Sequence, residues 1–468
     1  MSEFRLLING RLVPGDRSSP VLNPATEQAV AQCPRASEAQ LNEAVAAAKA
    51  AFPAWAALAI DARRTVLMKM ADRIDQHRDE LARLLTQEQG KPLREATGEV
   101  MRAAGFFRYF ASLDLPVKVA EDSADRRVEL HRRPLGVVAA IIPWNFPVMM
   151  VSFKVPPALL AGNTIVLKPS PTTPLATLRI AELVADMAPP GVLNVIADDN
   201  DLGTALTAHP DVRKISFTGS TATGKKVMAS ATDLLKRFTL ELGGNDAAIV
   251  LDDADPETVA KGLFSGAFAN AGQVCLAIKR VYVHDSIYDA VCDALARRAD
   301  EAVVGDGLEQ GTQIGPVQNR MQYEKLKHFL ESARRDGTII AGGTLLDGPG
   351  YFIRPTVVRD ITDGAELVDQ EQFGPVLPLI RYTDPQDALA RANASPYGLG
   401  GSVWSSSVPR AREIAARMDA GTVWVNRHLD LMPYIPMSGA KHSGIGVEFG
   451  EEGLAEYTQL HVLNLPGG

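Results

Sequence analysis

The stretch GVVAAIIPWNFP, residues 136–147, decides which fold the chain is expected to adopt. Its first half is a short apolar run without alternation, which is typical of a strand buried on both faces. Two prolines and Asn145 then interrupt the run, so that a turn leads into a helix expected at 151–161. The longest apolar segment, 136–153, therefore predicts a buried strand and a turn, not a membrane span.

Strand and helix patterns alternate after this stretch. Such alternation with short apolar strands predicts a parallel, doubly wound α/β sheet. The expected strands are 137–142, 164–167, 192–195, 214–217 and 237–240, and the expected helices are 151–161, 174–186, 202–208 and 222–230. A second α/β series follows, with strands 247–250 and 279–283 and helices 256–270 and 286–304.

Short strands and three helices are expected before residue 116. An Asn9-Gly10 hairpin turn indicates strands within 5–32. Alanine-rich runs with apolar residues every three or four positions predict helices. These helices span 38–55, 62–85 and 94–113. Further strands are expected at 127–131 and 458–465, and the chain is expected to pass between two domains near 242–246 and to return near 427–446.

The composition points to an ordinary globular protein. Its 468 residues suffice for two substantial domains, and 46% are apolar and 22% charged. The 48 basic and 56 acidic side chains, a net charge of −8, form no long runs of one sign, which argues against a nucleic-acid or membrane partner. Three widely spaced cysteines predict neither disulfides nor a metal site, and the first ten residues do not resemble a secretory signal. We therefore expect a cytoplasmic protein that acts on small molecules.

Two residues could carry nucleophilic and base chemistry. Cys275 ends the segment GQVC (272–275), where a loop between a helix and a strand can present a thiol to a cleft. A small buried apolar residue is the alternative interpretation. Glu241 ends a predicted strand and precedes two glycines, at the edge where ligands of open α/β sheets bind. Its carboxylate could act as a general base in a dry pocket, or it could form a helix cap or an ion pair between domains.

Three other segments have both a structural and a functional interpretation. The segment FTGS (217–220) opens a predicted helix whose free N–H groups could face a phosphate, or it is a well-capped loop. Asn145 could stabilise an oxyanion, or it could serve the turn between its two prolines. Lys168 could reach the ribose hydroxyls of a cofactor, or it could be an ordinary surface lysine.

Together these motifs resemble those of the aldehyde dehydrogenase superfamily. The interval of 34 residues from Glu241 to Cys275 is that family's spacing, and the resemblance covers nearly the whole chain in unbroken order. It rests on NPAT (23–26), PWNFP (143–147), GNT (162–164), KPS (168–170), FTGS (217–220), ELGG (241–244), GQVC (272–275), EQFGPV (371–376) and SGIG (443–446).

The resemblance implies an NAD(P)-dependent, non-acylating aldehyde dehydrogenase. Cys275 would attack the aldehyde carbon, and Asn145 and the Cys275 N–H would hold the oxyanion. Hydride transfer to the nicotinamide would leave a thioester, which water activated by Glu241 would hydrolyse to the acid. Lys154 and Glu448 match positions proposed to relay protons to that base, and a structural ion pair fits these two residues about as well.

The resemblance also implies a site for NAD or NADP. Lys168 would bond the adenosine ribose, Ser220 would contact the pyrophosphate, and Glu371 would hold the nicotinamide ribose beside Phe373. Pro171 stands where many NAD-preferring members have a glutamate that binds both ribose hydroxyls, so NADP could be accepted alongside NAD. The implied cofactor residues are Ile142, Pro143, Trp144, Lys168, Ser170, Pro171, Phe217, Thr218, Gly219, Ser220, Glu241, Leu242, Gly243, Glu371 and Phe373.

The implied substrate pocket is largely apolar and suits a semialdehyde or another small or medium aldehyde. Arg427 and His428 are polar exceptions, and either one, if it pointed inward, could hold a substrate carboxylate. An exposed or subunit-interface arginine is the alternative. The implied pocket residues are Phe146, Met150, Phe153, Val274, Leu276, Arg427 and His428.

The implied fold is α/β, with a Rossmann-type cofactor domain (1–115 and 135–241), an α/β catalytic domain (242–440) and a small β oligomerisation element (116–134 and 455–468). A homodimer or homotetramer is expected from that element. A coenzyme A-acylating dehydrogenase is one rival function, but it typically lacks the water-activating glutamate. A catalytically silent relative is another, but it would be expected to lose Cys275, Glu241 or Asn145, all of which are present.

Overall fold

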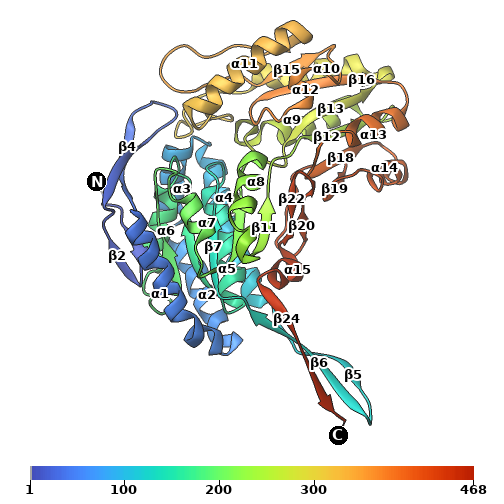
Figure 1. The fold of residues 1–468 in the computed structure, drawn as a ribbon. Coiled ribbons are helices and arrows are strands. Elements are labelled where there is room, and N and C mark those ends of the chain that lie inside the picture. Colours follow the sequence, from blue (N-terminus) through green and yellow to red (C-terminus); the bar gives the residue numbers. More distant parts are fainter. Residues whose placement is uncertain (1–2, 468) are drawn as a thin grey trace.

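Two mixed sheets, each mostly parallel, organise residues 3–467, which the computed structural model describes (Figure 1). The predicted α/β class is therefore confirmed. Residues 1 and 2 of the predicted cofactor domain and residue 468 of the predicted oligomerisation element lie outside the described residues.

The first sheet has the strand order β2-β1-β9-β8-β7-β10-β11-β22. Its five central strands run parallel, and the chain adds β8 and β9 on one side of β7 before it adds β10 and β11 on the other. Ligands of open α/β sheets bind beyond the carboxyl ends of the strands at such a switch point, here between β7 and β10. The strands are β1 (Leu6–Ile8), β2 (Arg11–Val13), β7 (Val137–Ile141), β8 (Thr164–Lys168), β9 (Leu193–Val195), β10 (Val212–Thr218), β11 (Arg237–Glu241) and β22 (Gly444–Ile445).

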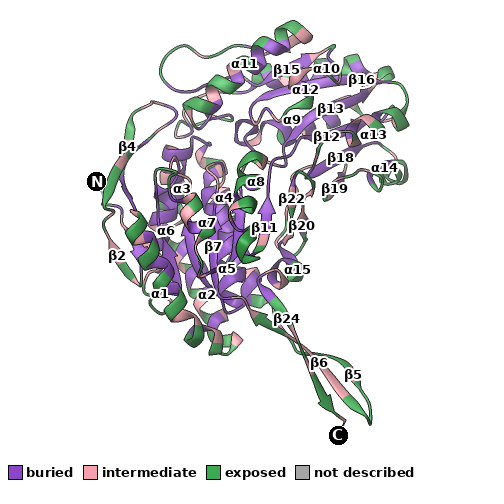
Figure 2. Ribbon diagram, viewed as in Figure 1, coloured by how far each residue is buried: buried purple, intermediate pink, exposed green. Residues whose placement is uncertain are grey.

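Helices cover this sheet and bury its apolar strands. Strands β7 and β8 are buried along their whole length, as the purple centre of this half of the molecule shows (Figure 2). The helices that precede the parallel strands are α1 (Glu38–Ala57), α2 (Ile60–Gln76), α3 (Arg78–Gln89) and α4 (Leu93–Ser112). The helices between the strands are α5 (Pro147–Leu160), α6 (Leu175–Val184), α7 (Gly203–Ala208) and α8 (Thr221–Ser230), which the short 3-10 helix η1 (Thr232–Leu234) follows.

The prediction of one helix over 62–85 is wrong, because two helices meet at His77. The N–H of this residue still donates to the Arg73 carbonyl as in a helix, but its φ of −101° and ψ of 18° depart from helical values, and α2 ends there. The apolar periodicity continues through the break because both helices bury a face, with Leu67 on α2 and Leu81 on α3 fully inside the core.

Helix α5 begins at Pro147, four residues before the predicted start at 151. Its first turn is capped from another helix, because Oε1 of Glu99 on α4 accepts the N–H groups of Val148 and Met149, each at 3.0 Å. Proline at the first helical position also suits this start, since its missing N–H is not needed there.

The second sheet has the order β14-β15-β16-β13-β12-β18-β19, with only β14 antiparallel. Its strands are β12 (Asp246–Val250), β13 (Ile278–His284), β14 (Thr338–Ala341), β15 (Thr356–Arg359), β16 (Val376–Tyr382), β18 (Gly400–Trp404) and β19 (Thr422–Val425). Its helices are α9 (Pro256–Phe268), η2 (Ala269–Gly272), η3 (Asp285–Ile287), α10 (Tyr288–Glu301), α11 (Arg320–Asp336), α12 (Glu366–Asp369), α13 (Pro385–Asn393) and α14 (Val408–Ala415). The helix predicted over 286–304 is thus shorter, and it starts with the 3-10 turn η3.

A third sheet projects from the body of the molecule (Figure 1). It is antiparallel and consists of β5 (Lys118–Asp122), β6 (Arg126–Pro134) and β24 (Thr458–Pro466). The strands predicted at 127–131 and 458–465 are therefore confirmed, and most of their residues are exposed or half-buried (Figure 2). The remaining elements are β3 (Arg17–Leu22), β4 (Ala29–Arg35), β17 (Tyr397–Gly398), β20 (Met437–Ser438), β21 (Ala440–Lys441), β23 (Val447–Glu448) and α15 (Gly450–Ala455).

Within residues 3–467, no helix taken singly has the length and apolar character to cross a membrane, although α1 and α2 together, bent by 120°, meet the criteria of length and composition.

Candidate active site

A cavity of about 540 Å³ opens at the switch point of the first sheet. This volume lies in the range of ordinary ligand pockets. Cys275 and Asn145 line it, and so does every predicted cofactor residue except Glu241, which is buried beside it. The predicted members of the lining are Ile142, Pro143, Trp144, Asn145, Met150, Lys168, Ser170, Pro171, Phe217, Thr218, Gly219, Ser220, Leu242, Gly243, Cys275, Glu371 and Phe373.

The N-terminus of α8 faces this cavity. Ser220 is its N-cap residue, and the Ser220 hydroxyl accepts the N–H of Thr223. The other N–H groups of the first turn have no partner within the helix, and the partial positive charge there favours an anion. The predicted interpretations of FTGS as a capped loop and as a phosphate site are therefore compatible.

Two aromatic rings and one carboxylate are part of the cavity lining. Trp144 and Phe373 meet edge to face, with ring centroids 5.4 Å apart. The Glu371 carboxylate accepts the N–H of Gly244 at 3.0 Å. Burial raises the pKa of Glu371, and the nearby ammonium of Lys279 opposes that shift.

Lys168 is not a surface lysine. Its side chain is buried, and its ammonium forms an ion pair with Asp198 at 2.6 Å. Asp198 also accepts the N–H of Leu202 at 2.9 Å. The lysine therefore stands at the cavity in a fixed position, with a counter-ion that the sequence did not predict.

Glu241 is the last residue of β11 and is only 4% exposed. Neither of its carboxylate oxygens has a hydrogen-bond partner among the described residues. Burial raises the pKa of Glu241 to about 7, while the neighbouring thiol of Cys275 and the ammonium of Lys154 act against this rise. A carboxylate with that pKa is divided between acid and base forms near neutral pH, as a general base requires.

Cys275 lies in the loop between η2 and β13, partly exposed to the cavity. Burial raises the pKa of this thiol well above its usual value, and the adjacent Glu241 carboxylate raises it further. Three residues ahead of it adopt left-handed backbone conformations, Asn270 with φ 50°, Ala271 with φ 54° and Gly272 with φ 72°. Such conformations are unfavourable for non-glycine residues, and strained backbone often occurs at functional sites.

Asn145 is buried between the two halves of the molecule. Its Nδ2 donates one hydrogen to the Gln273 carbonyl at 2.9 Å, which leaves the second hydrogen of the amide available in the cavity that Asn145 lines. The backbone carbonyl of Asn145 accepts one hydrogen bond from the Lys91 ammonium at 2.9 Å and another from the Asn270 side-chain amide at 3.0 Å. Side chain and backbone are thus both held in place.

The chain is similar to known proteins over nearly its whole length. The model of the aldehyde dehydrogenase family matches residues 13–463. The chain belongs to this family. A probable aldehyde dehydrogenase from Pseudomonas sp is 42% identical over 98% of this chain and 93% of its own length. The mitochondrial succinate-semialdehyde dehydrogenase of Arabidopsis thaliana is 41% identical over 94% of this chain and 84% of its own length.

A solved structure of betaine aldehyde dehydrogenase from Staphylococcus aureus, in complex with NAD+, matches this fold with a TM-score of 0.96. It is 33% identical to this chain, and the match covers 99% of this chain and 96% of that one. The protein is thus an NAD(P)-dependent aldehyde dehydrogenase.

The predicted pocket residues of this aldehyde dehydrogenase do not all lie at the cavity. Met150 lines it, whereas Phe153 packs on Phe449 with ring centroids 4.4 Å apart. Arg427 is largely exposed and forms an ion pair with Asp430 at 2.7 Å, as the alternative interpretation proposed. The side chain of His428 is fully buried, although the residue as a whole is half-buried. Of the remaining predicted pocket residues, Val274 and Leu276 are buried and Phe146 is half-buried.

His428 lies beside the carboxylate of Asp246. Its Nε2 bonds to the Leu276 carbonyl at 2.7 Å and lies 3.7 Å from the Asp246 carboxylate. A side chain enclosed in this way does not point into the cavity as the carboxylate-binding hypothesis required.

The remaining predicted pair, Lys154 and Glu448, is buried, and the two side chains are in direct contact.

Sequence reasoning missed the residues that hold Asn145. The ammonium of Lys91 is fully buried, contacts the Glu99 carboxylate and lies 3.7 Å from the centroid of the Phe146 ring. Glu99 had one detectable signal, because it is a charged residue on the apolar face of α4, flanked by the buried Ala96 and Ala103. Lys91 had no such signal, since it lies outside any helix or strand.

We predict that Lys91→Met lowers the free energy of unfolding by about 3–5 kcal/mol, because it leaves the Glu99 carboxylate buried without a counter-ion. Chemical denaturation would measure the loss. The double variant Lys91→Met with Glu99→Gln should recover a large part of it, since an amide oxygen can still cap α5 without a buried charge. A loss below 1 kcal/mol in the single variant would contradict the assigned pairing.

Proposed function

We propose that this enzyme oxidises an aldehyde to a carboxylic acid through a covalent intermediate on Cys275, which water activated by Glu241 then hydrolyses. The observation that supports this proposal most strongly is the contrast between Cys275 and Glu241. Cys275 is open to the cavity, while Glu241 is buried, has no hydrogen-bond partner among residues 3–467 and has a pKa that burial raises to about 7. A nucleophile and a poised base therefore share one end of the cavity.

In the first step the Cys275 thiol releases its proton to solvent in the cavity to which it is partly exposed, and the resulting thiolate attacks the aldehyde carbon. A carbon–sulfur bond forms, and the carbonyl oxygen becomes an oxyanion held by the free hydrogen of the Asn145 amide and by the Cys275 N–H. NAD(P)+, when bound, supplies the acceptor for the hydride that leaves this carbon, so that a thioester remains on Cys275. Glu241 then takes a proton from water, the resulting hydroxide attacks the thioester carbon, and the sulfur leaves as a thiolate.

Lys154 and Glu448 are proposed to move the proton that Glu241 gains. Their buried side chains touch each other, and both influence the ionisation of Glu241, in opposite directions. Glu448 has one carboxylate oxygen without a partner among the described residues, so it retains capacity to accept a proton. A purely structural pair would leave fewer unsatisfied groups.

The cavity fits the proposed NAD(P) site. A Cβ atom on Gly243 would lie 2.6 Å from the Glu371 carboxylate, so a side chain there would displace that carboxylate. The α8 N-terminus would take the pyrophosphate, Lys168 would reach the adenosine ribose, and Glu371 would hold the nicotinamide ribose. Pro171 brings no negative charge against a 2′-phosphate, so we propose that NADP is accepted alongside NAD.

The substrate is proposed to be an uncharged small or medium aldehyde. Arg427 points to Asp430, and His428 is enclosed beside Asp246, so neither of the two predicted cations is free to bind a substrate carboxylate. Hydrolysis is favoured over transfer to coenzyme A, because Glu241 is present and placed beside Cys275.

The domain organisation is proposed to follow the two large sheets, with 1–115 and 135–241 as the cofactor domain and 242–440 as the catalytic domain. The projecting sheet β5-β6-β24 is proposed as the oligomerisation element. Its exposed apolar residues include Val119, Leu460 and Val462. The three free thiols, Cys33, Cys275 and Cys292, support the cytoplasmic location that the composition predicts.

We predict a homodimer or homotetramer in solution, since apolar side chains on a projecting antiparallel sheet favour association. Light scattering would give the mass. Replacing both Leu460 and Val462 by Asp should shift the mass toward that of the monomer. A wild-type protein that is monomeric at micromolar concentration would refute the assignment.

We predict that Cys275→Ala abolishes cofactor reduction, while Glu241→Gln keeps a rapid burst of reduced cofactor followed by slow turnover. The reason is that the thiol is needed for oxidation, whereas the carboxylate is needed only for hydrolysis. Stopped-flow absorbance with NAD+ or NADP+ and a panel of aldehydes would measure both phases. Equal loss of the burst in both variants would contradict the separate roles assigned to Cys275 and Glu241. A wild-type enzyme that reduced no cofactor with any aldehyde would contradict the proposed function.

We predict that the steady rate after the burst depends on pH with an apparent pKa of about 7. The base form of Glu241 is required, so the rate should fall about tenfold per pH unit below that value and level off above it. Glu241→Gln should remove this limb of the profile. Persistence of the same limb in the glutamine variant would assign the titration to another group.

A further inference from the structure

We propose that Lys279 is a positioning residue, whose buried ammonium orients the backbone of the Cys275 loop and fastens Glu371 to it. The inference rests on the proposed function, since it concerns the same nucleophile and the same oxyanion. Lys279 is the second residue of β13, and its side chain is only 2% exposed. None of the sequence motifs included it.

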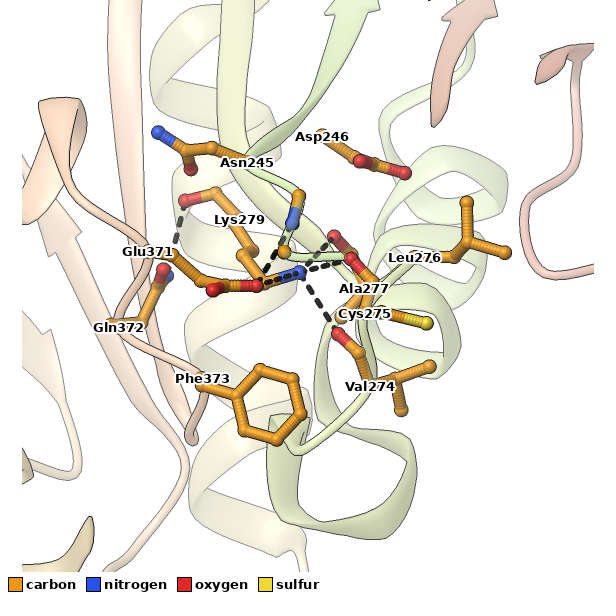
Figure 3. A network of polar contacts seen from close by, with 12 residues as sticks. Asn245, Asp246, Val274, Cys275, Leu276, Ala277, Lys279, Glu371, Gln372 and Phe373 are labelled. Atoms are coloured by element: carbon orange, nitrogen blue, oxygen red, sulfur yellow. Dashed lines mark hydrogen bonds and ion pairs between the residues drawn. The ribbon is translucent and has the colours of Figure 1, made fainter. Parts of the chain in front are cut away.

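The ammonium of Lys279 is enclosed by carbonyl groups of the loop that carries Cys275, residues 274–277, which we call the nucleophile loop (Figure 3). It donates to Val274 at 2.9 Å and to Cys275 at 2.6 Å, and the Ala277 carbonyl lies at 3.5 Å. An ammonium has three hydrogens and no acceptor, so it suits a ring of oxygens. Without it, several carbonyls would share a buried space with no donor, which is unfavourable.

The bond to Val274 determines where the Cys275 N–H points. A trans peptide is planar, with its carbonyl and its N–H on opposite sides. Because the Val274 carbonyl points toward the Lys279 ammonium, the Cys275 N–H of the same peptide points away from that ammonium. This N–H is the proposed second donor to the oxyanion. The first donor is fixed similarly, since the Gln273 carbonyl holds the Asn145 amide.

Lys279 also joins this loop to the segment around Glu371. Its ammonium lies 3.7 Å from the Glu371 carboxylate and 5.9 Å from the centroid of the Phe373 ring. Its backbone carbonyl accepts from the Gln372 amide at 3.1 Å. Lys279 therefore joins the segment of Glu371 and Gln372 to the Cys275 loop by two contacts, one from its ammonium and one from its backbone carbonyl.

The charge of Lys279 also acts on the nucleophile. Burial and the Glu241 carboxylate raise the pKa of Cys275, and Lys279 is the cation that opposes them. Loss of this cation should make the thiolate harder to form. A residue that only filled space would leave the ionisation of the thiol unchanged.

The test compares Lys279→Met, which keeps length but loses charge and donors, with Lys279→Arg, which keeps both. Lys236→Met is the matched control. Lys236 is also buried and donates to two carbonyls, those of Thr207 and His209, but it precedes β11 at the end of the strand opposite to Glu241. Lys279→Gln, which retains donors without charge, serves in place of the methionine variant if that protein does not fold.

Three measurements are made: the burst rate at saturating NAD+, the Kd of NAD+, and the pH dependence of iodoacetamide alkylation at Cys275 without cofactor. Lys279→Met should slow the burst about 100-fold, as expected for loss of one oxyanion donor. It should also weaken NAD+ binding and move the alkylation profile to higher pH. Lys279→Arg should recover part of each change, and Lys236→Met should alter none of them, whatever its effect on thermal stability.

The proposal is overturned if folded Lys279→Met, or Lys279→Gln in its place, shows a burst within threefold of wild type and an unshifted alkylation profile. It is also overturned if Lys236→Met produces the same losses. Failure of the proposed function is a separate outcome, because the wild type itself would then show no burst with any aldehyde.

Discussion

The close approach of the Gly243–Gly244 backbone to the nucleophile loop is the constraint on which the site depends. A Cβ atom on Gly244 would lie 2.7 Å from the Cys275 carbonyl oxygen, and one on Gly243 would lie 2.6 Å from the Glu371 carboxylate. At Gly244, where the near atom belongs to the backbone, only a residue without a side chain allows this approach. It lets the chain pass from β11 to β12 in four residues, so that Glu241 at the end of one sheet lies beside the loop that enters the other.

Around the passage of the chain from β11 to β12, almost every buried charged side chain has an ion-pair or hydrogen-bond partner. Lys91 has Glu99, Lys154 has Glu448, Lys168 has Asp198, and Lys279 has a set of carbonyls. Buried charges are tolerated only when they are paired or hydrogen-bonded. Glu241 is the exception, since both of its oxygens lack partners among the described residues. The cost of desolvating an unpartnered carboxylate appears as its raised pKa, which is the property that a base near neutral pH needs.

Much of the architecture could be predicted because local patterns were consistent with it. Apolar runs such as 137–142 and 164–167 became fully buried strands, and the alternation of strands and helices implied the parallel order. The errors arose where a distant contact set the start of a helix, or where the apolar pattern continued through a break between two helices. The start of α5 depends on a carboxylate of α4, and the break at His77 separates two helices that bury similar faces.

The sequence by itself determined the family, the strand-end and loop positions of Glu241, Cys275 and Asn145, and the set of proposed cofactor residues, most of which line one cavity, because these depend on order and spacing along the chain. Only the tertiary structure decided the ionisation of Glu241, the enclosure of His428 beside Asp246 and the contacts of Lys91 and Lys279. Burial and pairing depend on groups far apart in the sequence that meet in space. No local pattern specifies which carbonyl or carboxylate a buried ammonium will face.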